Sequence, residues 1–214
     1  MGFFKRFSKG GKDDAQGDHV LDHPRHLGIG DIVKFGFCDQ AGLSNQEFLI
    51  KGIKTYDLNP RQEAVSAFCF TANQREYSLS TAPQHAGDTI AVEMRVFPED
   101  VGSIFSLQQF GAIMDPDTGT THVLQRENNP AEFEGWTSPR YLQEAFHEAY
   151  LHEGDYRGKS LPDEKESSIP FDYYYLISDQ RRHAIRIEVF EGGKTDVYLI
   201  AYIPVRKIEE MWPK

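Results

Sequence analysis

The sequence predicts an α+β protein that is mostly antiparallel β, built as one sheet or two packed sheets with one main helix. From about residue 27, short runs rich in Val, Ile, Phe and Tyr alternate with Gly, Pro, Asn and Asp. The connections between these runs are too short for the helical crossovers that parallel strands require. One longer segment repeats its apolar residues at helical spacing.

The clearest strand signal lies near the C-terminus. Ile185, Ile187 and Val189 alternate with polar residues, Gly192 and Gly193 turn the chain, and the next run alternates back. This pattern predicts a hairpin with one face in the core. Upstream, an aromatic run with no interleaved basic residues favours a sheet over a base-stacking surface. The predicted strands are 31–37, 47–55, 64–71, 76–80, 89–97, 109–114, 120–125, 173–178, 184–190 and 195–203.

The main helix is expected over 138–153. Ser138 is a typical N-cap residue, Pro139 suits the first helical position, and Gly154 follows the end. A second, short helix is expected at 207–212. The apolar face of the main helix would consist of Leu142, Ala145, Phe146, Ala149 and Tyr150.

The chain divides into a tail and one folded unit. Residues 1–19 are basic, aromatic and glycine-containing, with little to bury, which predicts a mobile tail. Residues 20–214 are expected to form a single β-rich globular domain. Within it, 155–170 is rich in Gly, Pro, Ser and charges and is predicted to be a loop prone to disorder.

Composition restricts the class of protein. The 214 residues are 39% hydrophobic and 26% charged, which is the range of globular rather than disordered chains. The formal net charge of -10 disfavours nucleic acid as a partner. No apolar run is long enough to span a bilayer, and no apolar segment of a signal peptide follows the basic N-terminus. A cytoplasmic protein is expected.

The two cysteines, Cys38 and Cys69, lie in apolar, strand-like runs. Free cysteine in such a setting behaves as a small buried hydrophobic residue. Two buried, inert thiols are therefore expected, while a bridge between Cys38 and Cys69 stays open at this point.

The cluster that most resembles a metal or catalytic site consists of His147, Glu148 and His152. A zinc-binding helix of the metalloprotease type needs its histidines four residues apart, whereas these are five apart. On a helix the cluster would lie opposite the apolar face and point to water. We therefore expect no metal, no cofactor and no catalytic residues. Phosphate-binding glycine loops, nucleophile elbows and dinucleotide fingerprints do not occur either.

Several short motifs resemble a YjfK-like bacterial family of unknown function. They are the Phe-rich basic tail, the run at 23–30, the Tyr77-Ser78-Leu79 strand and the strand at 174–178, and the likeness covers most of residues 20–212. The resemblance implies a small cytoplasmic protein often encoded beside a relative of the phage-shock membrane-stress protein. It implies no catalytic residues.

These observations favour a non-enzymatic cytoplasmic interaction or accessory protein of bacteria, with a protein as partner, peripheral to the inner membrane in a stress response. Two alternatives stay open. One is a metal-dependent hydrolase that uses His147, Glu148 and His152. The other is a small-ligand binding module with a pocket between the sheet and the 138–153 helix.

The tail could provide the membrane contact. In a helical conformation its phenylalanines would cover one arc and its basic residues a separate arc. Each basic residue near an anionic leaflet contributes about 1 kcal/mol, which the cost of ordering the segment largely offsets. The predicted contact residues are Phe3, Phe4, Lys5, Arg6, Phe7 and Lys9.

We predict that the full-length protein co-sediments weakly with anionic vesicles and that high salt abolishes this binding, because the attraction is mainly electrostatic. The comparison is a protein that starts at Asp18. Equal binding by the two proteins, or binding that survives replacement of Phe3, Phe4 and Phe7 by serine, would contradict the prediction.

Overall fold

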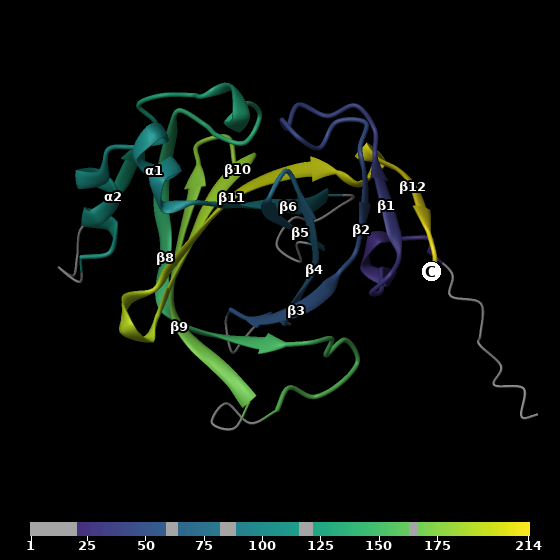
Figure 1. Ribbon diagram of the computed structural model, residues 1–214. Coiled ribbons are helices and arrows are strands. Elements are labelled where there is room, and N and C mark those ends of the chain that lie inside the picture. Colours follow the sequence, from purple (N-terminus) through teal and green to yellow (C-terminus); the bar gives the residue numbers. More distant parts are fainter. Residues whose placement is uncertain (1–20, 59–63, 82–88, 116–121, 163–166) are drawn as a thin grey trace, which may run out of the picture.

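Eight antiparallel strands form a closed barrel in the computed structural model, which describes residues 21–58, 64–81, 89–115, 122–162 and 167–214. β8 pairs with β3 and so closes the ring, and Figure 1 shows the strands around a common interior. In the order in which they neighbour one another, the strands are β3 (Gly52–Asp57), β4 (Val65–Ala72), β5 (Arg75–Thr81), β6 (Thr89–Val96), β11 (Thr195–Pro204), β10 (His183–Phe190), β9 (Ser168–Ser178) and β8 (Arg140–Glu153).

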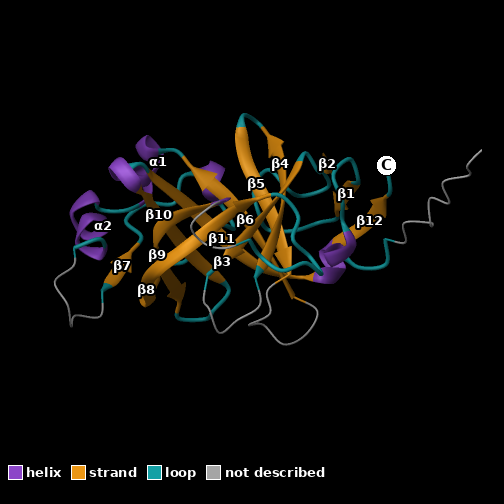
Figure 2. Ribbon diagram, turned by 90° about the horizontal axis from the view of Figure 1, so that it is seen from below, coloured by secondary structure: helices purple, strands orange, loops and turns teal. Residues whose placement is uncertain are grey.

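Smaller elements flank the barrel. A three-stranded sheet of order β12-β1-β2 lies at one side, and two helices lie at the opposite side, as Figures 1 and 2 both show. Within the described part of the chain, no helix is long and apolar enough to cross a membrane. These elements are β1 (Ile32–Phe35), β2 (Glu47–Leu49), β12 (Ile208–Trp212), α1 (Pro98–Ile104), α2 (Leu107–Ile113), β7 (Val123–Gln125), which extends the sheet beyond β8, and the 3-10 turns η1 (Pro24–His26), η2 (Ala131–Phe133), η3 (Glu191–Gly193) and η4 (Val205–Lys207).

The predicted α+β fold with one main helix is wrong. The 138–153 segment contains β8, the longest strand, which pairs with β9 along its length and also with β3 and β7. Its residues favour helix intrinsically, but the ladders on both sides outweigh that preference. A bulge between Gln143 and Ala145 shifts the alternation, so apolar positions that mimic helical spacing lie on both faces of the strand.

Two further assignments need correction. The 207–212 segment is not a helix, because Ile208–Trp212 forms β12 and pairs with β1. The strand predicted at 109–114 lies largely in α2, where the Ser106 hydroxyl accepts a hydrogen bond from the Gln109 amide as an N-cap. The hairpin of β10 and β11 is confirmed, with Gly192 at a φ of 80° in the turn.

The expected loop at 155–170 is replaced in part by strand, since β9 begins at Ser168. The tail, with Phe3, Phe4, Lys5, Arg6, Phe7 and Lys9, lies outside the described residues. Its membrane contact therefore stays a prediction.

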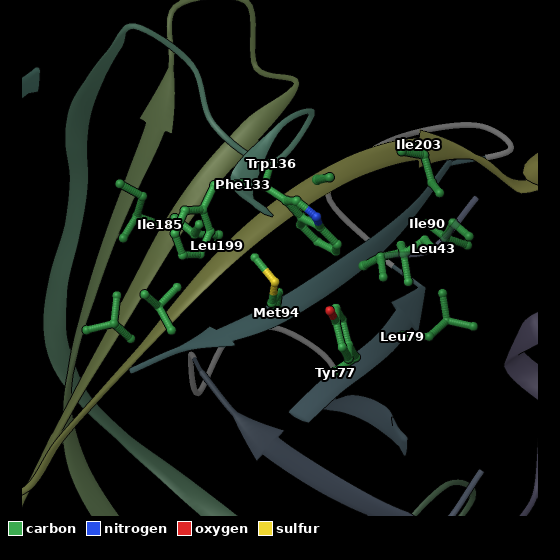
Figure 3. Packing of buried hydrophobic residues seen from close by; sticks show 14 of the residues in the cluster. Leu43, Tyr77, Leu79, Ile90, Met94, Phe133, Trp136, Ile185, Leu199 and Ile203 are labelled. Carbon is green, nitrogen blue, oxygen red and sulfur yellow. The ribbon is translucent and has the colours of Figure 1, made fainter. Parts of the chain in front are cut away.

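The outward face of the barrel wall is apolar. It packs against the small sheet, the two helices and the segments around residues 41 and 136. Trp136 is fully buried there, its indole N–H donates to the Ala41 carbonyl at 2.9 Å, and its ring lies 5.9 Å from that of Tyr77. We call this the outer cluster, and Figure 3 shows its members Leu43, Tyr77, Leu79, Ile90, Met94, Phe133, Trp136, Ile185, Leu199 and Ile203.

The inward face is different, because it mixes small, aromatic and charged side chains. Contacts between strands that are not neighbours identify it as the interior. Tyr56 of β3 meets Phe171 of β9 at 6.3 Å, and Arg186 of β10 reaches Glu93 of β6. The apolar part, which we call the inner cluster, consists of Tyr56, Ala67, Ala91, Ala149, Leu151, Phe171, Tyr173, Tyr175, Ile177, Ala184 and Ile200.

Ser138 does not cap a helix. Its hydroxyl lies 2.8 Å from Nδ1 of His183, whose Nε2 lies 2.9 Å from the Gly135 carbonyl. A carbonyl can only accept, so Nε2 carries the proton and Nδ1 accepts from Ser138. Burial lowers the pKa of His183, which keeps the ring neutral in this arrangement. The pair joins the segment before β8 to the start of β10.

We predict that Ser138→Ala destabilises the protein by about 1 kcal/mol, the usual contribution of a neutral hydrogen bond. The loss should disappear in a His183→Leu background, because the serine then has no imidazole to donate to. Urea denaturation of the two single variants and the double variant measures this coupling. Additive effects would show that Ser138 acts independently of His183.

Candidate functional site

Arg186 lies at the centre of the barrel interior. Its guanidinium makes a bidentate contact with Glu93, from Nη1 to Oε1 at 2.9 Å and from Nη2 to Oε2 at 2.7 Å. Its Nε lies 2.9 Å from Glu188 Oε1, an ion pair without hydrogen-bond alignment. The Ser78 hydroxyl donates to Glu93 Oε2 at 2.8 Å. One arginine therefore joins β10 to β6, and through the serine to β5.

Two tyrosine rings enclose the same guanidinium. The carbon at its centre lies 4.5 Å from the ring centroid of Tyr56 on β3 and 4.5 Å from that of Tyr198 on β11. Such contacts are favourable in a desolvated site, because the ring faces carry negative charge density. Since β3 and β11 lie on opposite sides of the ring, Arg186 contacts side chains from both sides of the barrel.

Glu188 is a titratable group of this network whose pKa is moved close to neutral pH. Burial raises the pKa of its carboxyl to about 7, against the pull of Arg186, and the Glu93 charge adds to the rise. A carboxyl with this pKa gains and loses its proton near neutral pH.

A pocket of about 130 Å³ opens beside this network. Its lining residues come from β3 and the residue before it, the end of β4, the start of β5 and from β11, so it lies toward the barrel end where the β4–β5 hairpin turns. We call it the mouth pocket. It is lined by Lys51, Lys54, Tyr56, Cys69, Phe70, Thr71, Glu76, Tyr77, Ser78 and Tyr198.

Both tyrosines that enclose Arg186 also line the mouth pocket. Tyr56 is 3% exposed and Tyr198 is 8% exposed. Neither phenol hydroxyl has a hydrogen-bond partner among the described residues. Neither oxygen is fully buried, because neither is among the buried polar atoms that lack a partner. Burial raises the pKa of both groups, so both stay protonated and able to donate near neutral pH.

The charges around the mouth pocket are unequally paired. Lys51 donates to the Thr71 hydroxyl at 2.5 Å, and Glu76 pairs with Arg95 at 3.3 Å. Lys54 has no ion-pair partner within the described ranges. The pocket therefore presents two ammonium groups, Lys51 and Lys54, that form no ion pair among the described residues, although the Lys54 charge acts on Glu188 at longer range.

The structure does not bring His147, Glu148 and His152 together. Side chains alternate along β8, so His147 faces the interior beside Tyr173, at 5.0 Å between ring centroids, while Glu148 and His152 face outward. Glu148 is exposed, whereas His152 is 1% exposed and lies beside Tyr156. The expectation that the whole cluster points to water is wrong for His152, which is buried, and for His147, which faces the barrel interior. Among the described residues, no three His, Cys, Asp or Glu side chains could hold a metal ion.

Cys38 and Cys69 are both free thiols. Cys38 packs in the outer cluster, whereas Cys69 lines the mouth pocket. Burial raises the pKa of Cys69 to about 11, so it is a thiol and not a thiolate near neutral pH. Its S–H donates to the Ala67 carbonyl at 3.6 Å, and it offers the pocket no activated nucleophile.

A second hollow lies on the outside of the barrel. It measures about 770 Å³ and is open to solvent, between the 37–46 segment, the β4–β5 turn and residues 134–135. Phe37 is 69% exposed at its edge, and Asp39 and Glu134 add negative charge. We call it the outer cleft.

Comparison of the chain with family models, with curated proteins and with solved structures finds no match. The interpretation of the site therefore rests on its geometry alone. Sequence reasoning missed Tyr56, Tyr198 and Arg186, although the alternation of Arg186 and Glu188 with isoleucines was visible. That pattern shows two faces, and it does not show that the polar face lies inside a closed ring.

We predict that the stability of the wild type, relative to Glu188→Gln, falls as pH rises from about 4.5 to 7. The folded-state pKa lies above the ordinary value of 4.5, so over this window the folded protein keeps a proton that the unfolded chain has lost. The full difference is about 3 kcal/mol and is reached at about pH 8, where the carboxyl is deprotonated in both states. Denaturant unfolding of both proteins at several pH values checks it. Parallel stability curves would refute it.

Proposed function

We propose that this chain is a non-enzymatic binding protein that takes a small polar ligand in the mouth pocket. The observation that supports this most directly is the pair of buried tyrosines, Tyr56 and Tyr198, which line the pocket and whose hydroxyls have no hydrogen-bond partner among the described residues. Buried polar groups without partners are costly, and a bound ligand would satisfy them. The closed barrel supplies a rigid frame around them.

The same geometry favours binding over catalysis. Glu93, Glu188 and Arg186 are paired with one another at 5% exposure or less. The Cys69 thiol is not activated. The pocket thus offers donors and ammonium groups, and it places no free base beside a nucleophile.

The outer cleft supports a second candidate function, the docking of a protein partner. Its exposed Phe37 is a large aromatic side chain at the edge of an open hollow, which is typical of an interaction anchor. Under this proposal the protein is an accessory factor of the bacterial cytoplasm, peripheral to the inner membrane in a stress response. The YjfK-like resemblance and the basic tail support that setting.

The ligand-binding proposal is tested by thermal unfolding with a panel of small carboxylates, neutral sugars and amides, and amines. We expect at least one class to raise the Tm, because a ligand at 100 times its Kd adds about 2.7 kcal/mol to the free energy of unfolding. Thr71→Trp places a large side chain at the mouth and should abolish the effect. Thr89→Trp, at the start of β6 and away from the pocket residues, is the matched control. No shift with any compound, or an equal shift in Thr71→Trp, would refute the proposal.

A further inference from the structure

We infer that the ligand of the mouth pocket is a small carboxylate, bound by the Lys54 ammonium and the hydroxyls of Tyr56 and Tyr198. This inference rests on the proposed binding function and adds the chemical class of the ligand. It follows from the balance of donors and acceptors, from charge and from size.

The mouth pocket has more unpaired hydrogen-bond donors than unpaired acceptors. An ammonium group can only donate, and Lys54 has no ion-pair partner among the described residues. Both phenols have an O–H to donate. Among the lining acceptors, the Glu76 carboxylate pairs with Arg95 and the Thr71 hydroxyl accepts from Lys51. The Ser78 oxygen, which donates its proton to Glu93, keeps lone pairs but carries no charge. A ligand that complements this set brings oxygen acceptors, as a carboxylate does.

The charges around the pocket also favour an anionic ligand. Lys51 and Lys54 line the pocket, and the single lining carboxylate, Glu76, is paired with an arginine. The Arg186 guanidinium lies against the faces of both tyrosine rings, on the inner side of the pocket. Burial raises the pKa of both phenols, and the Arg186 charge opposes that rise. An anion is therefore favoured over an amine.

The size limits the anion. A cavity of about 150 Å³ holds a benzene molecule, so the mouth pocket, at about 130 Å³, accepts a carboxyl group with a few carbon atoms. A longer molecule would keep its remaining chain outside the mouth. The apolar edge provided by Cys69 and the tyrosine rings suits the carbon atoms next to the carboxylate.

The test is an NMR titration of the full-length protein, labelled with ¹⁵N, in a carboxylate-free and phosphate-free buffer. The probes are propionate, its uncharged analogue propionamide, and inorganic phosphate. We expect propionate to shift amide signals of β3, β4 and β5, and to bind at least tenfold more tightly than propionamide and phosphate, since only propionate joins one planar anion to a short apolar chain.

The variants locate the contacts. Lys54→Gln should weaken propionate binding about tenfold, and Tyr56→Phe and Tyr198→Phe about fivefold each, as expected for a charged and for neutral hydrogen bonds. Lys159→Gln and Tyr156→Phe are matched controls outside the pocket and should bind as the wild type does.

Each other outcome counts against the inference in a recognisable way. Equal affinity for propionate and propionamide, or unchanged affinity in Lys54→Gln, would refute the carboxylate and leave the binding function intact. Tighter binding of phosphate than of propionate would refute the carboxylate and show that the pocket prefers a different oxyanion. Shifts away from β3 to β5 would refute the site. Failure of every compound here and in the thermal panel would refute the binding function itself.

Discussion

The contact between Arg186 and Glu93 in the middle of the barrel determines how the rest of the chain must be arranged. It places permanent charge inside the ring, where removal from water is expensive unless the partners are well aligned. The bidentate geometry, the Ser78 hydroxyl and the two tyrosine rings supply that alignment. With charge on the inward face, the alternation of β-strands leaves the apolar side chains on the outward face. That face then needs a cover, which the small sheet, α1, α2 and the segment around Trp136 provide. The strands of the barrel thus separate a charged interior from an apolar core that lies outside the ring.

This arrangement fixes register more strictly than an apolar interior would. A shift of one residue in β10 would move Arg186 and Glu188 to the outer cluster and bring Ile185 and Ile187 inside, so both faces would lose their partners at once. The same holds for β6, where Glu93 lies between apolar neighbours that belong to the outer cluster. The ionic contact adds little net stability compared with a well-packed apolar group, but it penalises every alternative pairing heavily. Specificity of pairing is a useful property in a closed ring, because all the strands must be in register for the last pair, β3 and β8, to form.

The sequence predicts the local part of this fold and misses the non-local part. The β10–β11 hairpin follows from alternation and two glycines, which are all contained in one short segment. β8 could not be recognised, since Glu, Ala, Gln and Leu favour helix and the ladders that override this preference come from strands far away in the sequence. The wrong assignment of β8 also made the prediction for the histidines wrong. A helix would place His147, Glu148 and His152 on one side, whereas a strand places His147 on the opposite face from the other two. Tyr56 and Tyr198 give no signal at all. Their relation exists only once β3 and β11 stand opposite one another with an arginine between them.

The β4–β5 hairpin connects the two hollows of the molecule. Cys69, Thr71 and Ser78 line the mouth pocket. Phe70 and Tyr77, on the same two strands, also border it, and their rings stack on each other in the outer cluster with centroids 5.5 Å apart. Phe70 in turn packs on Phe48, and Phe48 lines the outer cleft together with Ala72 and Asn73 of the hairpin. Because one backbone carries both sets of side chains, any displacement of this hairpin changes the mouth pocket and the outer cleft together. A ligand that orders β4 and β5 from within would thereby favour one shape of the cleft outside, in proportion to the difference in its affinity for the two positions of the hairpin. The two proposed functions, ligand binding in the mouth pocket and partner docking at the outer cleft, would in this way be coupled through the β4–β5 hairpin.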